Sequence, residues 1–134
     1  MENADSLRQV LRTETAPSHA RVDALISQHD LTCPDGMAAF LAIHHLAYTA
    51  LGGPLRAAEG AGGPPLPLED IEADLAMLGR TPLRWRTLPA LDLRHPAGLI
   101  YVVAGSRLGA TVLRARWQES RNQDVLRASR FLDS

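Results

Sequence analysis

Cysteine, aromatic residues and long hydrophobic runs are all scarce in this chain of 134 residues. A single cysteine, Cys33, excludes an intramolecular disulfide framework and fits a reducing compartment, so we expect a cytoplasmic protein. Aromatic residues make up 4% of the sequence, and Val, Ile and Thr do not gather in alternating runs, which disfavours a β-rich fold. The longest apolar run, Ala97 to Ala104, is too short to cross a membrane, and the polar first residues do not resemble a signal peptide.

An excess of charge of either sign is also missing. The formal net charge is −1, and charged residues make up 22% of the chain, so the composition indicates no polyanionic partner such as nucleic acid. At 134 residues, with a hydrophobic share of 46%, the chain is large enough to bury a core. We therefore expect one globular domain over residues 1–134 with no nucleic-acid or membrane partner.

Apolar residues recur at helical spacing in most of the sequence. This spacing predicts helices over residues 6–12, 15–29, 37–51, 68–78, 98–117 and 124–132. The first two are equally compatible with one bent helix, and the third is expected to continue beyond a kink at Gly52-Gly53-Pro54. Gly79 is expected to end the helix over 68–78, and residues 60–67 and 81–92 are predicted to be loops. The fold class is therefore all-α.

The predicted helix over residues 98–117 contains two glycines that need an explanation. Gly105 and Gly109 are four residues apart, so they expose a strip of bare backbone on one face, with Tyr101 one turn earlier and Ser106 beside it. Each glycine costs about 1 kcal/mol relative to alanine in a helix interior. Close packing of a second helix is one explanation, and a flat ligand is the other.

A histidine near the start of the chain favours the ligand. Thr15 is predicted to cap a helix with Pro17 in its first turn, which places His19 on one stripe with Val22 and Leu25. A hydrogen-bonded core histidine would explain this position as well. An inward imidazole opposite a bare glycine face, however, is the arrangement that a heme needs.

Three segments resemble bacterial, biliverdin-producing heme oxygenases. Leu11 to Leu25 (LRTETAPSHARVDAL) resembles the proximal helix of that family, and Tyr101 to Leu113 (YVVAGSRLGATVL) resembles its distal helix. Between them, Asp70 to Gly79 (DIEADLAMLG) is similar to the family's Asp-Leu-x-x-Leu-Gly helix. The resemblance covers nearly the whole chain in order, and it implies a heme oxygenase-like helical bundle, shortened at its C-terminal end.

The resemblance also implies a role for each matched residue. His19 would be the axial ligand of the heme iron, and Arg12 and Tyr101 would meet the heme propionates. Gly105 and Gly109, with Ser106 beside them, would form the distal wall over the heme. The family cleaves heme oxidatively to biliverdin, carbon monoxide and iron, with electrons from a ferredoxin or a reductase.

Two departures from the family leave a second function open. Ala104 stands where close relatives often carry a glutamate, and the chain ends soon after the glycine-bearing helix, where family members continue. The alternative is a non-catalytic heme oxygenase-like module for heme binding, sensing or protein interaction. A shortened bundle would expose an apolar face, so a homodimer is also expected.

Overall fold

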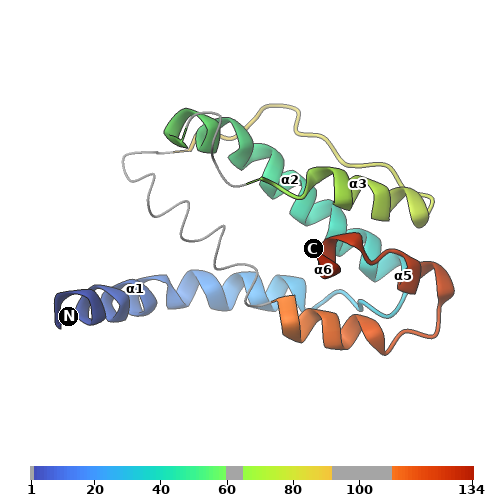
Figure 1. Cartoon of the computed structure of the whole chain (residues 1–134), viewed down its shortest axis with the longest axis horizontal. Helices are drawn as coiled ribbons and strands as arrows, with labels where there is room; N and C mark the ends of the chain where they lie inside the picture. Colours follow the sequence, from blue (N-terminus) through green and yellow to red (C-terminus); the bar gives the residue numbers. More distant parts are fainter. Residues whose placement is uncertain (1, 60–64, 92–109) are drawn as a thin grey trace.

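The structure is a computed structural model that describes residues 2–59, 65–91 and 110–134, and helices are the only regular secondary structure in these ranges, with no strand in any of them (Figure 1). This confirms the predicted all-α class. The helices are α1 (Glu2–Ile26), α2 (Pro34–Glu59), α3 (Leu68–Met77), α5 (Gln123–Arg127) and α6 (Arg130–Asp133), and residues 110–118 are helical as well. Within the described part of the chain, no helix combines the length and apolar character needed to cross a membrane.

α1 is one continuous helix, which decides between the two arrangements that the sequence left open. Thr15 lies inside this helix, and its hydroxyl donates a hydrogen bond to the carbonyl of Leu11 at 2.7 Å. The predicted N-cap at Thr15 is therefore wrong. Pro17 is also an interior residue, where it lacks the N–H that would bond to the preceding turn. α1 makes no extensive contact with α2, α3, α5 or α6, and Ile26 at its end packs against the core.

The start of α2 is held by a compact turn. The backbone N–H and the hydroxyl of Thr32 both donate to Oδ1 of Asp30, at 2.9 and 2.6 Å. These two bonds stabilise the ionised carboxyl and lower the pKa of Asp30. Gly36, in the first turn of α2, lies so close to this loop that a Cβ atom there would be 2.0 Å from the carbonyl oxygen of Asp30. Only glycine fits at this contact.

α2 continues through Gly52-Gly53-Pro54, as the sequence allowed. Proline disfavours the helical conformation of the residue before it because its ring contacts that residue's Cβ. Gly53 has no Cβ, and the space around this position is open in the structure. The ring of Pro54 therefore meets no Cβ atom at residue 53, and α2 extends to Glu59.

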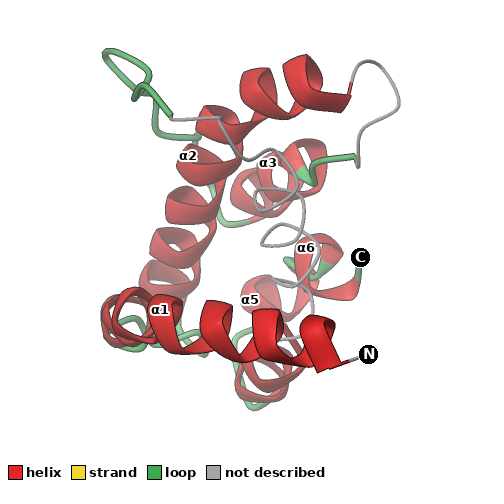
Figure 2. Cartoon of the chain, turned by 90° about the vertical axis from the view of Figure 1, so that its left-hand side faces the viewer, coloured by secondary structure: helices red, strands yellow, loops and turns green. Residues whose placement is uncertain are grey.

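α3 pairs with α2 (Figure 2). The most deeply buried apolar side chains come from α2, α3 and the C-terminal residues, and they are Met37, Phe40, Leu41, Ile71, Leu75 and Val125. α3 ends as predicted at Gly79, whose φ of 70° suits glycine. The N–H groups of Gly79 and Arg80 bond to the carbonyls of Ala76 and Leu75, which satisfies the last turn of α3.

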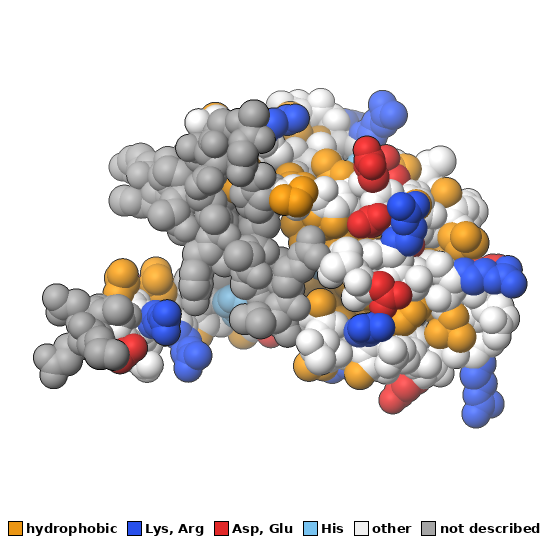
Figure 3. Space-filling model, viewed as in Figure 1, with side chains coloured by type: hydrophobic (Ala, Val, Ile, Leu, Met, Phe, Trp, Pro, Cys, Tyr) orange, Lys and Arg blue, Asp and Glu red, His pale blue; other side chains and the backbone are white. Residues whose placement is uncertain are grey.

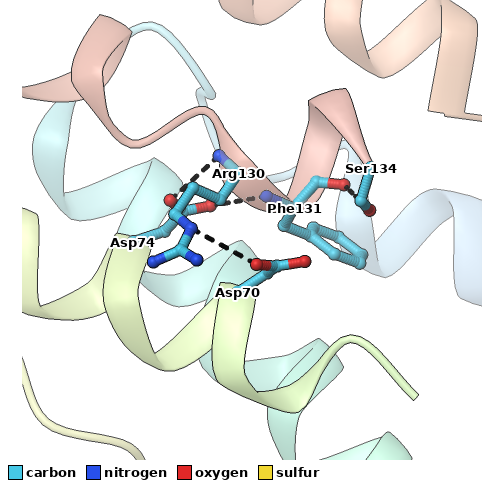
Figure 4. A network of polar contacts seen from close by, with 5 residues as sticks. All are labelled: Asp70, Asp74, Arg130, Phe131 and Ser134. Atoms are coloured by element: carbon cyan, nitrogen blue, oxygen red, sulfur yellow. Dashed lines mark hydrogen bonds and ion pairs between the residues drawn. The ribbon is translucent and has the colours of Figure 1, made fainter. Parts of the chain in front are cut away.

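The C-terminal residues return to α3 and are fixed there by a buried aspartate. Asp74 is 1% exposed, and its two carboxylate oxygens accept the backbone N–H groups of Arg130 at 3.0 Å and Phe131 at 2.8 Å (Figure 4). These are the first residues of α6, so Asp74 satisfies two of its unpaired N–H groups from a different helix. Ala128 and Ser129 are not helical and separate α5 from α6, so the single helix predicted over 124–132 is wrong.

Replacing Gly36 with alanine is expected to destabilise the fold by about 1–3 kcal/mol, because the backbone of the Asp30 turn must move to admit the methyl group. Gly52→Ala is the matched control. A Cβ at Gly52 meets Leu66 at an ordinary 3.6 Å, so this change should stabilise the protein by about 0.5–1 kcal/mol. Urea unfolding measures both. Equal and small effects of the two substitutions would contradict the close contact at Gly36.

Asp74→Ala is expected to cost about 2–4 kcal/mol of unfolding free energy, because it leaves two backbone N–H groups of α6 without their acceptor. Asp70→Ala is the control on the same helix. It removes an ion pair to Arg130 at 3.3 Å, in which Arg130 is well exposed and Asp70 about one-third exposed, and a carboxylate from the first turn of α3. It should cost at most about 1 kcal/mol. Chemical denaturation measures both, and an equal loss from the two variants would show that the backbone contacts of Asp74 contribute little.

Candidate functional site

The two predicted heme contacts of the N-terminal segment lie on the surface of α1. His19 and Arg12 are both exposed along this helix. The expectation that His19 faces a packed interior with Val22 and Leu25 is therefore wrong, because α1 does not pack that face against the described helices. The ring of His19 is accessible, and its role as an iron ligand stays a prediction.

α1 also exposes its apolar face. Leu7, Leu11, Val22 and Leu25 are between 43% and 60% exposed, and Figure 3 shows hydrophobic side chains along the edge of this helix. Residues at this spacing lie on one side of a helix. Glu14 and Ser18 interrupt this side of the helix, so its apolar residues form two exposed groups, one at Leu7 and Leu11 and one at Val22 and Leu25. Exposed apolar groups of this kind suit a binding surface. The predicted homodimer is one occupant of such a surface, and it stays a prediction.

The predicted distal residues lie outside the described part of the chain. These residues are Tyr101, Gly105, Ser106 and Gly109, and the described segment resumes at Ala110. Within the described residues, no group of three or more His, Cys, Asp or Glu side chains is arranged to hold a metal ion.

The half-buried His44 lies in an aromatic cluster that the sequence did not single out. His44 contacts Phe40, Tyr48 and Phe131, with ring centroids 4.3, 6.4 and 5.3 Å apart. Its Nδ1 is 2.8 Å from the carbonyl of Phe40, which accepts the Nδ1–H of the neutral ring. Burial lowers the pKa of His44 below its usual 6.5, against a smaller opposite effect of this hydrogen bond. His44 is therefore a neutral core residue.

The neighbouring His45 lies in a different environment, at the edge of a pocket. Its Nε2 is 2.9 Å from Oε1 of Glu72 on α3, and its side chain is 10% exposed. The pocket has a volume of about 470 Å³ and lies between α2, α3 and the segment over residues 83–88. Trp85 fixes that segment by donating from Nε1 to the carbonyl of Leu46 at 2.8 Å. The sequence contained no signal for this pocket, because its polar residues come from three separate segments.

The stability of the protein should fall on acidification through the titration of His44. Since its folded pKa lies below 6.5, the unfolded chain binds the proton more readily, so the contribution of His44 is complete above that pH and is lost as the pH falls. His44→Phe should reduce the difference between unfolding free energies measured at about pH 7.5 and about pH 5.5. An unchanged difference in His44→Phe would contradict the neutral assignment.

Comparisons with known proteins place this chain in no family. No family model matches it, nor does any curated protein or solved structure. The resemblance to bacterial heme oxygenases therefore rests on the sequence motifs alone.

Proposed function

We propose that this protein is a heme oxygenase that binds heme through His19 and cleaves it to biliverdin, carbon monoxide and iron. The observation that carries the proposal is the exposed imidazole of His19 on a helix whose apolar face has no described helix packed on it. A porphyrin needs a flat apolar surface and an accessible nitrogen ligand, and the exposed face of α1 offers both.

The spacing of His19 and Arg12 on α1 also suits contacts with the iron and with a propionate of the same heme. His19 and Arg12 are seven residues apart, which is about 10 Å along a helix and nearly two full turns, so both side chains leave the same side. This span is comparable to the distance from the centre of a porphyrin to its propionates. His19 would hold the iron through one ring nitrogen, and the guanidinium of Arg12 would pair with a propionate.

The apolar residues of α1 supply the remaining affinity. Leu11 and Val22 lie on either side of His19 along the helix, and both expose about half of their surface. Burying such side chains against the porphyrin removes them from water, at about 25 cal/mol for each Å² of apolar surface. On the other side of the heme, Tyr101 would contact a propionate. The distal wall would consist of Gly105, Ser106 and Gly109.

The bound heme supplies the oxygen chemistry, with electrons from a ferredoxin or a reductase. The chain's own residues have a narrower task. They hold the ring in one orientation, leave room above the iron where Gly105 and Gly109 lack side chains, and keep the ring's apolar faces out of water. The fold suited to this task is a heme oxygenase-like bundle in which α1 forms the proximal wall.

Hemin titration tests the assignment of His19. Addition of hemin should produce a Soret band that saturates at one equivalent, and His19→Ala should weaken binding about tenfold or more and shift the band. Alanine is a good helix former, so this surface substitution should leave the helix content unchanged. His29→Ala is the matched control and should bind like the wild type. A Soret band that is the same in His19→Ala would overturn the axial-ligand assignment.

Turnover separates the enzyme from the non-catalytic module. With a reductase system or ascorbate in air, the Soret band of the enzyme should decay while biliverdin absorption grows. A Soret band that depends on His19 but persists under these conditions would establish heme binding without catalysis. Ala104, in place of the glutamate that close relatives often carry, is the feature that favours this second outcome.

A further inference from the structure

The pocket beside His45 has an inner wall made of hydrogen-bond acceptors. The carboxylate of Glu72 accepts a hydrogen bond from Nε2 of His45 at 2.9 Å. Nδ1 of His45 is buried without a hydrogen-bond partner among the described residues. The hydroxyl proton of Thr49 is donated to the carbonyl of His45 at 2.7 Å, so its oxygen is left as an acceptor.

The acceptors of Glu72 and Thr49 suit a donor-rich cation. Glu72 carries the formal charge of this wall, and about half of its side chain is exposed. Its Oε1 takes the bond from His45, while Oε2 has no bond from any side chain in the described ranges. A primary ammonium has three N–H donors in a compact group, and it would satisfy both Glu72 and Thr49.

The rest of the pocket has a different character. Arg84 lines it and forms no ion pair with any residue that the structure describes, so its guanidinium is available to an anion. Leu68, Leu83, Trp85 and Leu88 supply apolar walls, and Trp85 is held in place by its bond to Leu46. The pocket is an open groove, since Leu83 and Leu88 are 57% and 59% exposed, and its volume of about 470 Å³ lies in the range of small-molecule sites in other proteins.

We propose that this pocket binds a zwitterionic ligand with an apolar body, such as a free apolar amino acid. Its ammonium lies on Glu72 and Thr49, its carboxylate pairs with Arg84, and its side chain packs against Trp85 and the leucines. Glu72 and Arg84 line one pocket with opposite charges and do not pair with each other. A ligand with both charges satisfies the two residues at once, which a simple amine or a simple carboxylate does not. This site is separate from the heme surface of α1 and does not depend on it.

Isothermal titration calorimetry on the full chain, without heme, tests the proposal with three ligands that share one apolar body. L-Phenylalanine carries both charges, phenethylamine carries only the ammonium, and hydrocinnamate carries only the carboxylate. L-Phenylalanine should bind saturably and about tenfold or more tighter than either of the others, because each charge contributes a charge-assisted contact.

Two variants assign the charges to residues. Glu72→Gln keeps an oxygen acceptor for His45 but removes the charge, and it should weaken L-phenylalanine and phenethylamine about tenfold while leaving hydrocinnamate unchanged. Arg84→Gln should weaken L-phenylalanine and hydrocinnamate instead. Glu69→Gln on α3 and Arg86→Gln are the matched controls, since neither residue lines the pocket, and both should bind like the wild type.

Several results would overturn the proposal. The first is the absence of saturable binding of L-phenylalanine, and the second is binding that neither Glu72→Gln nor Arg84→Gln changes. Equal affinity for L-phenylalanine and either single-charge ligand would also overturn it. If Glu72→Gln loses its helical circular dichroism, Thr49→Val serves in its place, because it removes one acceptor without changing a charge, and its failure to weaken L-phenylalanine would count against the site.

Discussion

Asp74 joins the last residues of the chain to the middle of the fold. Its two oxygens hold the N–H groups of Arg130 and Phe131, and this brings the side chains of α6 onto the contact between α2 and α3. Phe131 then completes the aromatic cluster around His44, at ring-centroid distances of 5.3 Å from His44 and 6.2 Å from Tyr48. The carboxylate of Asp74 therefore holds α6, and with it Phe131, against the core formed by α2 and α3.

This arrangement places two ionisable groups in the same core with opposite pH dependence. Burial raises the pKa of Asp74, and this effect exceeds the lowering by its two N–H donors. The folded state therefore holds the proton of Asp74 more tightly than the unfolded chain does, so its contribution to stability is greatest below pH 3.8 and falls as the pH rises through the folded pKa. His44 contributes in the opposite direction, above its usual value of 6.5. Both shifts have the same cause, which is that this core favours neutral side chains.

The sequence predicted those parts of the fold that depend on local chemistry. Helical spacing gave α2 and α3, and Gly79 marked the end of α3, because a left-handed residue is a local requirement. The predictions from sequence were wrong where the structure depends on contacts between residues far apart in the chain. The burial expected for His19 depends on what packs against α1, and spacing alone contains no information on that. The pocket was missed for a related reason, since Glu72 and Arg84 become neighbours only through the tertiary fold.

α1 differs from the rest of the described chain in how it is stabilised. It contains 25 residues and an interior proline, and its apolar side chains are largely in water. An isolated helix of this kind is held mainly by its own backbone bonds, which are marginal without tertiary packing. Its opening should therefore be local and should not require the α2–α3 core to open, so its amide hydrogens would exchange at a rate set by its own helix–coil equilibrium. Any molecule that covers this face would couple its binding to the ordering of α1, and the slowing of amide exchange in α1 would report that occupancy directly.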